Sequence, residues 1–238
     1  MLTSSLYCEG QEAKVLEVKG SRIAEPISIS GSWLSENYYN SIREFKSPRK
    51  AQDSSLFIVI PAMTLQPTNL IYNFHEGSAV LIFRKANDHY EIWESEHDSL
   101  FRWLGDVKII SPEKINFLNT TFVKISSSVN TNNSLILEAL LFKGYYLQSD
   151  GETIEFKDDR QIIGLDNFHF YKPVIDYYDA GLQVDQVDLG KSENDLQRFG
   201  FKFNGDTLEL YKLKCLTFEG HRCMEVDFGQ LAYKLWRN

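Results

Sequence analysis

The residues best suited to chemistry are a group of acids in the last third of the chain, Asp176, Asp179, Asp185 and Asp188. Carboxylate pairs can hydrolyse glycosidic bonds, and hard cations such as Ca²⁺ need several carboxylate oxygens at once. The group has neither the spacing nor the central glycine of an EF-hand loop. One hypothesis is therefore a hydrolase that uses the Asp176–Asp188 acids. The alternative is that these acids lie at strand edges and turns, where water solvates them.

The five histidines are dispersed along the chain and form no His-Glu-x-x-His pair. His89 and Glu91 would share one face of a strand and could ligate a metal ion, but the sequence identifies no third ligand. We therefore predict no metal site. The chain also lacks a Gly-x-Ser-x-Gly elbow, a phosphate-binding glycine loop and a dinucleotide fingerprint. We expect no cofactor and favour a protein that is not an enzyme.

Charge and composition narrow the class of partner. The 238 residues carry a formal net charge of −8, and the pI is about 5.2. Nucleic-acid binding needs clustered cations, which the sequence lacks, so we expect no nucleic-acid partner. No apolar run approaches the ~18 residues of a membrane helix, so no membrane span is expected. The start of the chain shows no signal peptide, but removal of one would leave the same sequence, so a secreted or periplasmic location stays open.

Short strands separated by turns dominate the pattern, as in an antiparallel meander. Asn204-Gly205 is the strongest hairpin turn, and a change of phase near Tyr211 and Lys212 predicts a β-bulge. Apolar residues at helical spacing predict a short helix over residues 34–45, and an apolar run predicts a buried helix over residues 134–143 that could plug or cover a barrel.

Three cysteines do not make a disulfide framework. Cys215 and Cys223 flank a predicted hairpin turn at Gly220-His221, and the register of that hairpin places Cys223 opposite Phe218. We therefore predict that Cys215 and Cys223 are buried free thiols.

The two ends of the chain carry Gly31-Ser32-Trp33 and, just after the last predicted strand, Arg237. Together with the many short strands, these residues resemble the lipocalin and wider calycin group of β-barrels. In that group a tryptophan and an arginine stack at the closed end, and the open end receives a small apolar ligand. The resemblance implies that Gly31, Trp33 and Arg237 close one barrel. A barrel also leaves no open sheet edge.

We therefore predict a mainly β fold, in which an antiparallel meander closes into a lipocalin-like (calycin-like) barrel with one or two short helices. A β-sandwich or an α+β fold is the alternative. Residues 1–25 are expected to form a loosely ordered tail and residues 26–238 a single barrel domain. The polar stretch at residues 126–134 offers an alternative division into two domains.

Aromatic residues are numerous enough to line a cavity, with hydroxyl groups to orient a ligand. The leading hypothesis is that the protein binds or carries a small apolar or amphipathic molecule in the barrel cavity. The alternative is a protein- or glycan-interaction module with a filled core. The oligomeric state is not predicted. The predicted ligand-binding residues are Tyr72, Phe74, Tyr90, Trp93 and Tyr171.

Overall fold

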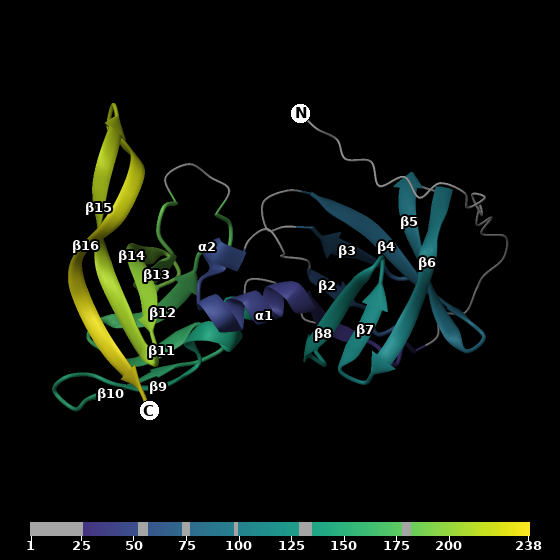
Figure 1. Ribbon diagram of the computed structural model, residues 1–238, viewed down its shortest axis with the longest axis horizontal. Coiled ribbons are helices and arrows are strands. Elements are labelled where there is room, and N and C mark those ends of the chain that lie inside the picture. Colours follow the sequence, from purple (N-terminus) through teal and green to yellow (C-terminus); the bar gives the residue numbers. More distant parts are fainter. Residues whose placement is uncertain (1–25, 52–56, 73–76, 98–99, 129–134, 178–181) are drawn as a thin grey trace.

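The strands form two closed antiparallel barrels (Figure 1). The computed structural model describes residues 26–51, 57–72, 77–97, 100–128, 135–177 and 182–238. The predicted mainly β fold, with a meander that closes into a barrel beside short helices, is confirmed. The predicted tail at residues 1–25 lies outside the described residues.

The first barrel contains eight strands that pair in sequence order, and β1 pairs with both β2 and β8 to close it. Its inward side chains include Phe83, Phe117 and Phe122, all at most 1% exposed. Phe117 and Phe122 stack with their ring centres 4.4 Å apart. The strands are β1 (Gly31–Ser35), β2 (Phe57–Ile60), β3 (Pro67–Ile71), β4 (Ser78–Ala86), β5 (His89–His97), β6 (Leu100–Ser111), β7 (Lys114–Phe117) and β8 (Thr120–Ser126).

The second barrel also contains eight strands, and β9 pairs with both β10 and β16 to close it. The hairpin turn predicted at Asn204-Gly205 joins β14 to β15, and the bulge predicted near Tyr211 is present as a register shift in β15. The strands are β9 (Gly144–Leu147), β10 (Thr153–Phe156), β11 (Gln161–Leu165), β12 (Phe168–Pro173), β13 (Gln186–Ser192), β14 (Asp195–Asn204), β15 (Thr207–Glu219) and β16 (Arg222–Arg237).

In the described part of the chain, three short helices lie where the barrels meet: α1 (Glu36–Phe45), α2 (Pro48–Ala51) and the π-helix η3 (Glu138–Phe142). The side chain of Ser35 caps α1 by accepting a hydrogen bond from the Tyr38 amide at 3.3 Å. Tyr38 and Ile42, on the predicted apolar stripe, are fully buried and share one hydrophobic core with the second barrel. Thus α1 packs between the two barrels, against β1 and β8 of the first and against the core of the second. No helix in the described part of the chain is long and apolar enough to cross a membrane.

Strand pairing corrects the prediction of one barrel over residues 26–238. The first barrel ends with β8 at Ser126 and the second begins with β9 at Gly144. The division therefore falls after Ser126, where the predicted alternative split at residues 126–134 begins, although residues 129–134 lie outside the described residues. Strand patterns alone do not reveal this division, because a meander of sixteen strands has the same local signals whether it closes once or twice.

The predicted stacking of Trp33 on Arg237 is also wrong, because the two residues belong to different barrels. Each barrel instead has its own aromatic ring and cation, which face each other across the strand pair that closes the barrel. Lys124 of β8 lies opposite Trp33, with its Nζ 5.4 Å from the ring centre. Arg237 of β16 lies opposite Tyr146, with its Cζ 5.6 Å from that ring centre.

The two closures match in further detail. Trp33 Nε1 donates to the carbonyl of Ile29 at 2.9 Å, and Tyr146 Oη donates to the carbonyl of Phe142 at 2.9 Å, four residues back in both cases. A glycine precedes each aromatic by two residues, with φ of +132° at Gly31 and +148° at Gly144. A glycine, an aromatic residue two positions later and a cation opposite that aromatic therefore occur in both barrels.

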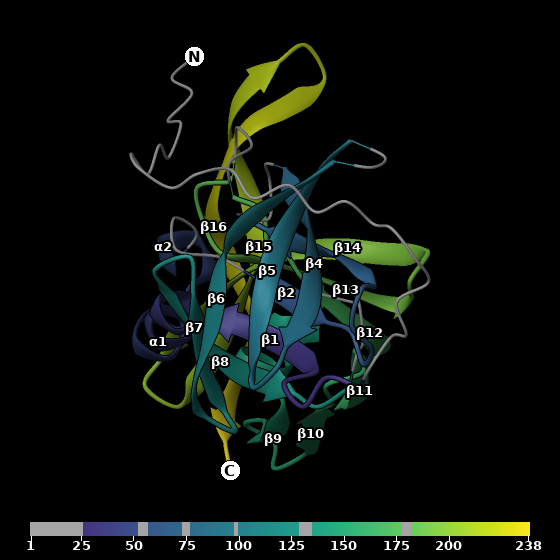
Figure 2. The same ribbon diagram turned by 90° about the vertical axis from the view of Figure 1, so that its right-hand side faces the viewer.

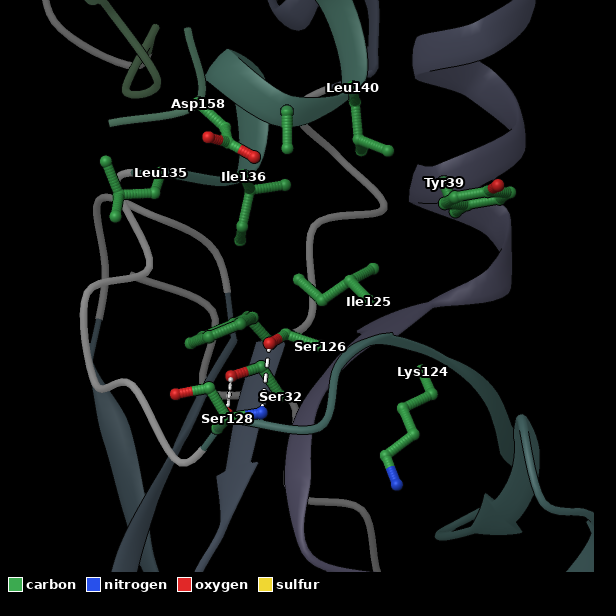
Figure 3. A pocket seen from close by; sticks show the side chains of 12 residues that line it. Ser32, Tyr39, Lys124, Ile125, Ser126, Ser128, Leu135, Ile136, Leu140 and Asp158 are labelled. Atoms are coloured by element: carbon green, nitrogen blue, oxygen red, sulfur yellow. Dashed lines mark hydrogen bonds between the residues drawn. The ribbon is translucent and has the colours of Figure 1, made fainter. Parts of the chain in front are cut away.

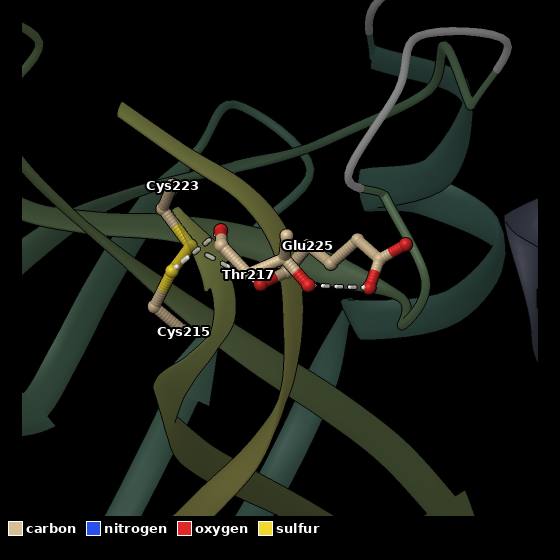
Figure 4. The surroundings of a disulfide bond; sticks show 4 residues. All are labelled: Cys215, Thr217, Cys223 and Glu225. Atoms are coloured by element: carbon tan, nitrogen blue, oxygen red, sulfur yellow. Dashed lines mark hydrogen bonds between the residues drawn. A yellow bond between two sulfur atoms is a disulfide. The ribbon is translucent and has the colours of Figure 1, made fainter. Parts of the chain in front are cut away.

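A long hairpin formed by β15 and β16 projects beyond the second barrel (Figures 1 and 2). A disulfide joins Cys215 to Cys223 near its tip (Figure 4), so the prediction of free buried thiols is wrong. Cys223 does lie opposite Phe218, as the turn implied. However, the register of β15 shifts twice between Cys215 and Phe218, and the two cysteine Cα atoms are 5.7 Å apart, within disulfide reach.

Candidate functional site: a cleft between the barrels

A cleft of about 440 Å³ lies between the first barrel, α1 and the segment that leads through η3 into the second barrel (Figure 3). This volume is within the range of small-molecule sites. The cleft combines an apolar wall with polar groups at its ends. It is lined by Ser32, Tyr39, Phe57, Lys124, Ile125, Ser126, Ser128, Leu135, Ile136, Ala139, Leu140 and Asp158.

Serines from β1 and the end of β8 form one polar end of the cleft (Figure 3). Ser32 Oγ donates to the carbonyl of Ser128 at 3.2 Å, and Ser126 Oγ accepts from the Ser128 amide at 3.0 Å. Lys124, two residues before Ser126 in β8, also lines this region. This end thus offers hydroxyl groups to a polar head group, whereas the Lys124 Nζ lies over the Trp33 ring.

The apolar wall comes from the run of residues predicted to form a buried helix over 134–143. Leu137, Leu141 and Phe142 point into the second barrel and are at most 3% exposed. Leu135, Ile136, Ala139 and Leu140 line the cleft instead. The predicted plug is confirmed at Phe142, whose ring centre lies 5.0 Å from that of Phe201 and 5.5 Å from that of Tyr171.

A buried ion pair fixes η3 to the second barrel. Glu138 is 0% exposed, and its Oε1 accepts from Arg160 Nε at 2.7 Å. Within the described part of the structure, Glu138 Oε2 has no hydrogen-bond partner. Burial raises the pKa of Glu138 to about 7, and the hydrogen bond from Arg160 opposes that rise. The backbone that carries the apolar wall is therefore held by a carboxyl group that titrates near neutrality.

The five residues predicted to bind ligand do not lie together. Tyr72 is 46% exposed on the first barrel, and Phe74 lies outside the described residues. Tyr90 and Trp93 are buried in the first barrel, where Tyr90 Oη accepts from the Ser28 amide at 3.0 Å and Trp93 Nε1 donates to Glu91. Tyr171 belongs to the core of the second barrel. These side chains therefore cannot line one common cavity.

Two of the four acids considered for a hydrolase, Asp185 and Asp188, are held by structural contacts. Asp185 accepts from Ser47 Oγ at 2.6 Å and from the Arg49 amide at 2.9 Å, and burial raises its pKa. Asp188 pairs with Arg198 through Nε at 2.7 Å and Nη2 at 3.0 Å. Asp179 lies outside the described residues. Asp185 and Asp188 thus give no support to a catalytic carboxylate pair.

The interaction-module hypothesis has one structural counterpart, the projecting β15–β16 hairpin. Leu216 is 52% exposed and Phe218 is 67% exposed near its tip. The disulfide cross-links the two strands, and charged residues along both strands give the hairpin a mixed polar and apolar surface. Recognition of a protein through it stays a hypothesis.

The chain matches no protein-family model, and no curated protein or solved structure shows significant similarity to it. The argument for function therefore rests on the geometry of the site. Sequence reasoning missed the polar cleft residues Ser32, Lys124 and Ser126 because their proximity to η3 depends on how the two barrels meet. The only signal for the site was the apolar run that supplies its wall.

Proposed function

We propose that the protein binds or carries a small amphipathic molecule, without chemical conversion, in the cleft between its two barrels. The observation that carries this proposal is a cleft of about 440 Å³ in which an apolar wall faces a hydroxyl-rich polar end. Burying the apolar part of a ligand against such a wall stabilises binding by about 25 cal/mol per Å², before the costs of association are subtracted.

The location differs from the barrel cavity that the sequence favoured. Ring-to-ring contacts occupy the interior of both barrels, between Phe83 and Phe117 in the first and among Phe142, Phe156 and Tyr171 in the second. Such close-packed interiors favour a structural role for the barrels. The cleft is the better candidate because it has volume, apolar surface and polar groups together.

The chemistry of the lining defines the ligand class. Tyr39, Ile136 and Leu140 suit an alkyl chain or a flat ring. Ser32 and Ser126 suit a hydroxyl or carboxylate head group at the opposite end (Figure 3). Lys124, whose Nζ turns away from these serines and lies over the Trp33 ring, would have to swing toward them to pair with a carboxylate. Asp158, which also lines the cleft, forms an ion pair with Lys143 and would disfavour a second negative charge on the ligand. We therefore propose a molecule with one apolar body and one hydroxyl or carboxylate head.

The test is titration of the full chain with dodecanoic acid and with its neutral glycerol ester, followed by calorimetry and thermal unfolding. A ligand that binds only the folded protein raises its melting temperature. Ala139→Trp places an indole in the cleft at an exposed position, so this variant should bind at least ten-fold more weakly while its own melting temperature is unchanged. Glu193→Trp, in the exposed turn between β13 and β14, is the matched control and should bind as the wild type does.

Lys124→Met separates head-group recognition from apolar burial. It should weaken binding of the acid more than binding of the ester, since only the acid carries a charge that pairs with Lys124. Equal binding by wild type and Ala139→Trp would refute the proposed location. A wild-type protein that binds neither probe would refute this ligand class.

A further inference from the structure

A second group of polar side chains lies on the outer wall of the first barrel, away from the residues that line the cleft. His89, Glu91 and Asp106 each place one ligand atom within 4.8 Å of the others. His89 and Glu91 are two residues apart on β5, and Asp106 is on the neighbouring strand β6. Because Tyr90 and Ile92 of β5 are buried in the barrel, alternation places His89 and Glu91 on the outer face.

Strand register gives an independent reason to expect a cation here. Glu91 lies directly opposite Asp106 in the β5–β6 pair. Two like charges at opposed positions of antiparallel strands destabilise the sheet. Arg84, which lies opposite Glu91 on β4, offsets part of this repulsion, and a cation bound between the two carboxylates would offset the rest. In the structure, Arg84 approaches Glu91 with Nη1 3.6 Å from Oε2, and His89 approaches Asp106 with Nε2 3.6 Å from Oδ1.

Two of the three candidate ligands are also oriented by neighbours in the way that metal ligands usually are. Asp88 Oδ1 lies 3.3 Å from His89 Nδ1, so a proton on Nδ1 leaves Nε2 available on the side of Asp106. Trp93 Nε1 donates to Glu91 Oε2 at 3.1 Å. Arg84 uses the same oxygen of Glu91, which leaves Oε1 to turn toward a metal ion.

From this arrangement we propose that His89, Glu91 and Asp106 form a binding site for a divalent transition-metal ion of the zinc class. One imidazole nitrogen and two carboxylates suit Zn²⁺, Ni²⁺ or Co²⁺ better than Ca²⁺, which takes six to eight oxygen ligands. Ligand atoms around a tetrahedral zinc ion lie about 3.4 Å apart, because each is 2.0–2.2 Å from the metal. The donors here lie within 4.8 Å of one another, so binding requires small side-chain rotations, for which Asp106 has room because its side chain is 55% exposed. Three protein ligands leave a fourth position for water or another ligand.

The site is tested by calorimetric titration of the full chain with Zn²⁺ and by the visible spectrum of the Co²⁺ complex. Cys8 is replaced by serine in every variant, because it is the one cysteine outside the Cys215–Cys223 disulfide and thiolates bind zinc. We expect one Zn²⁺ per chain and a Co²⁺ spectrum typical of a site with four or five ligands. Zn²⁺ should also raise the melting temperature.

Variants then assign the ligands. His89→Ala and Asp106→Asn should each weaken Zn²⁺ binding at least ten-fold, and both replace exposed side chains, so they should fold normally. Asp88→Ala removes the oxygen that orients His89 and should weaken binding about ten-fold. His169→Ala, at an exposed histidine on β12, is the matched control and should bind as the parent does. Unchanged binding in His89→Ala, or no binding of Zn²⁺, Ni²⁺ and Co²⁺ by the parent protein, would overturn the proposal.

Discussion

Replacement of Glu138 by glutamine should remove a dependence of stability on pH that the buried carboxyl group creates. Glu138 is fully buried beside Arg160, and its pKa rises from 4.5 to about 7. Because the pKa is higher in the folded chain, the folded state binds the proton more tightly than the unfolded state does. The stabilisation is therefore complete below pH 4.5 and is lost as the pH rises to about 7.

The magnitude follows from the two pKa values. One pKa unit corresponds to about 1.4 kcal/mol, so the change from 4.5 to about 7 corresponds to about 3 kcal/mol of folding free energy. Glutamine has nearly the same shape but cannot ionise, so Glu138→Gln should not lose this contribution. The variant should gain about 3 kcal/mol relative to the wild type when the pH is raised from about 4.5 to about 8.

Urea unfolding followed by circular dichroism at several pH values measures this difference. Glu152→Gln, which replaces an exposed glutamate in the loop before β10, is the matched control and should follow the wild type at every pH. If the stabilities of wild type and Glu138→Gln change in parallel with pH, Glu138 is not a buried titrating group and the reasoning fails.

Two further predictions concern the paired closures of the barrels. Arg237→Ala should destabilise the second barrel by about 1–2 kcal/mol, because it removes the cation over Tyr146 and the hydrogen bond from Nη2 to the carbonyl of Lys143 at 2.5 Å. Thermal unfolding measures this loss of stability, and an unchanged melting temperature would contradict the prediction. Gly31→Ala should cost about 2 kcal/mol or more, because a Cβ there would lie 2.4 Å from the carbonyl oxygen of Ser126 on backbone at φ +132°. Gly144→Ala should cost less, because its Cβ would meet only the movable side chain of Arg237 at 3.3 Å; a larger loss for Gly144→Ala would show that these contacts do not set the cost.

Local features of the fold could be predicted from the sequence because they depend on neighbouring residues. Helical spacing identified α1, the Asn204-Gly205 turn identified the β14–β15 hairpin, and a change of phase identified the bulge near Tyr211. Each of these depends on turn chemistry or side-chain periodicity within a few residues.

Features that depend on distant pairing could not be predicted in the same way. Trp33 and Arg237 were predicted to stack on each other, but each has its partner within its own barrel. The pair of His89 and Glu91 lacked a third ligand in the sequence, and only the register of β5 with β6 adds Asp106. The cleft likewise exists only where the first barrel meets η3.

The most direct measurement of the central claim is photo-crosslinking with dodecanoic acid that carries a diazirine in its alkyl chain, followed by peptide mass spectrometry of the full chain. If the cleft binds the ligand, adducts will concentrate on residues 135–140 and on Tyr39 and Ile125, and unlabelled dodecanoic acid will compete with them. Ala139→Trp will lose these adducts. Adducts that instead concentrate on barrel-interior residues or on the β15–β16 hairpin, and survive in Ala139→Trp, would contradict the account.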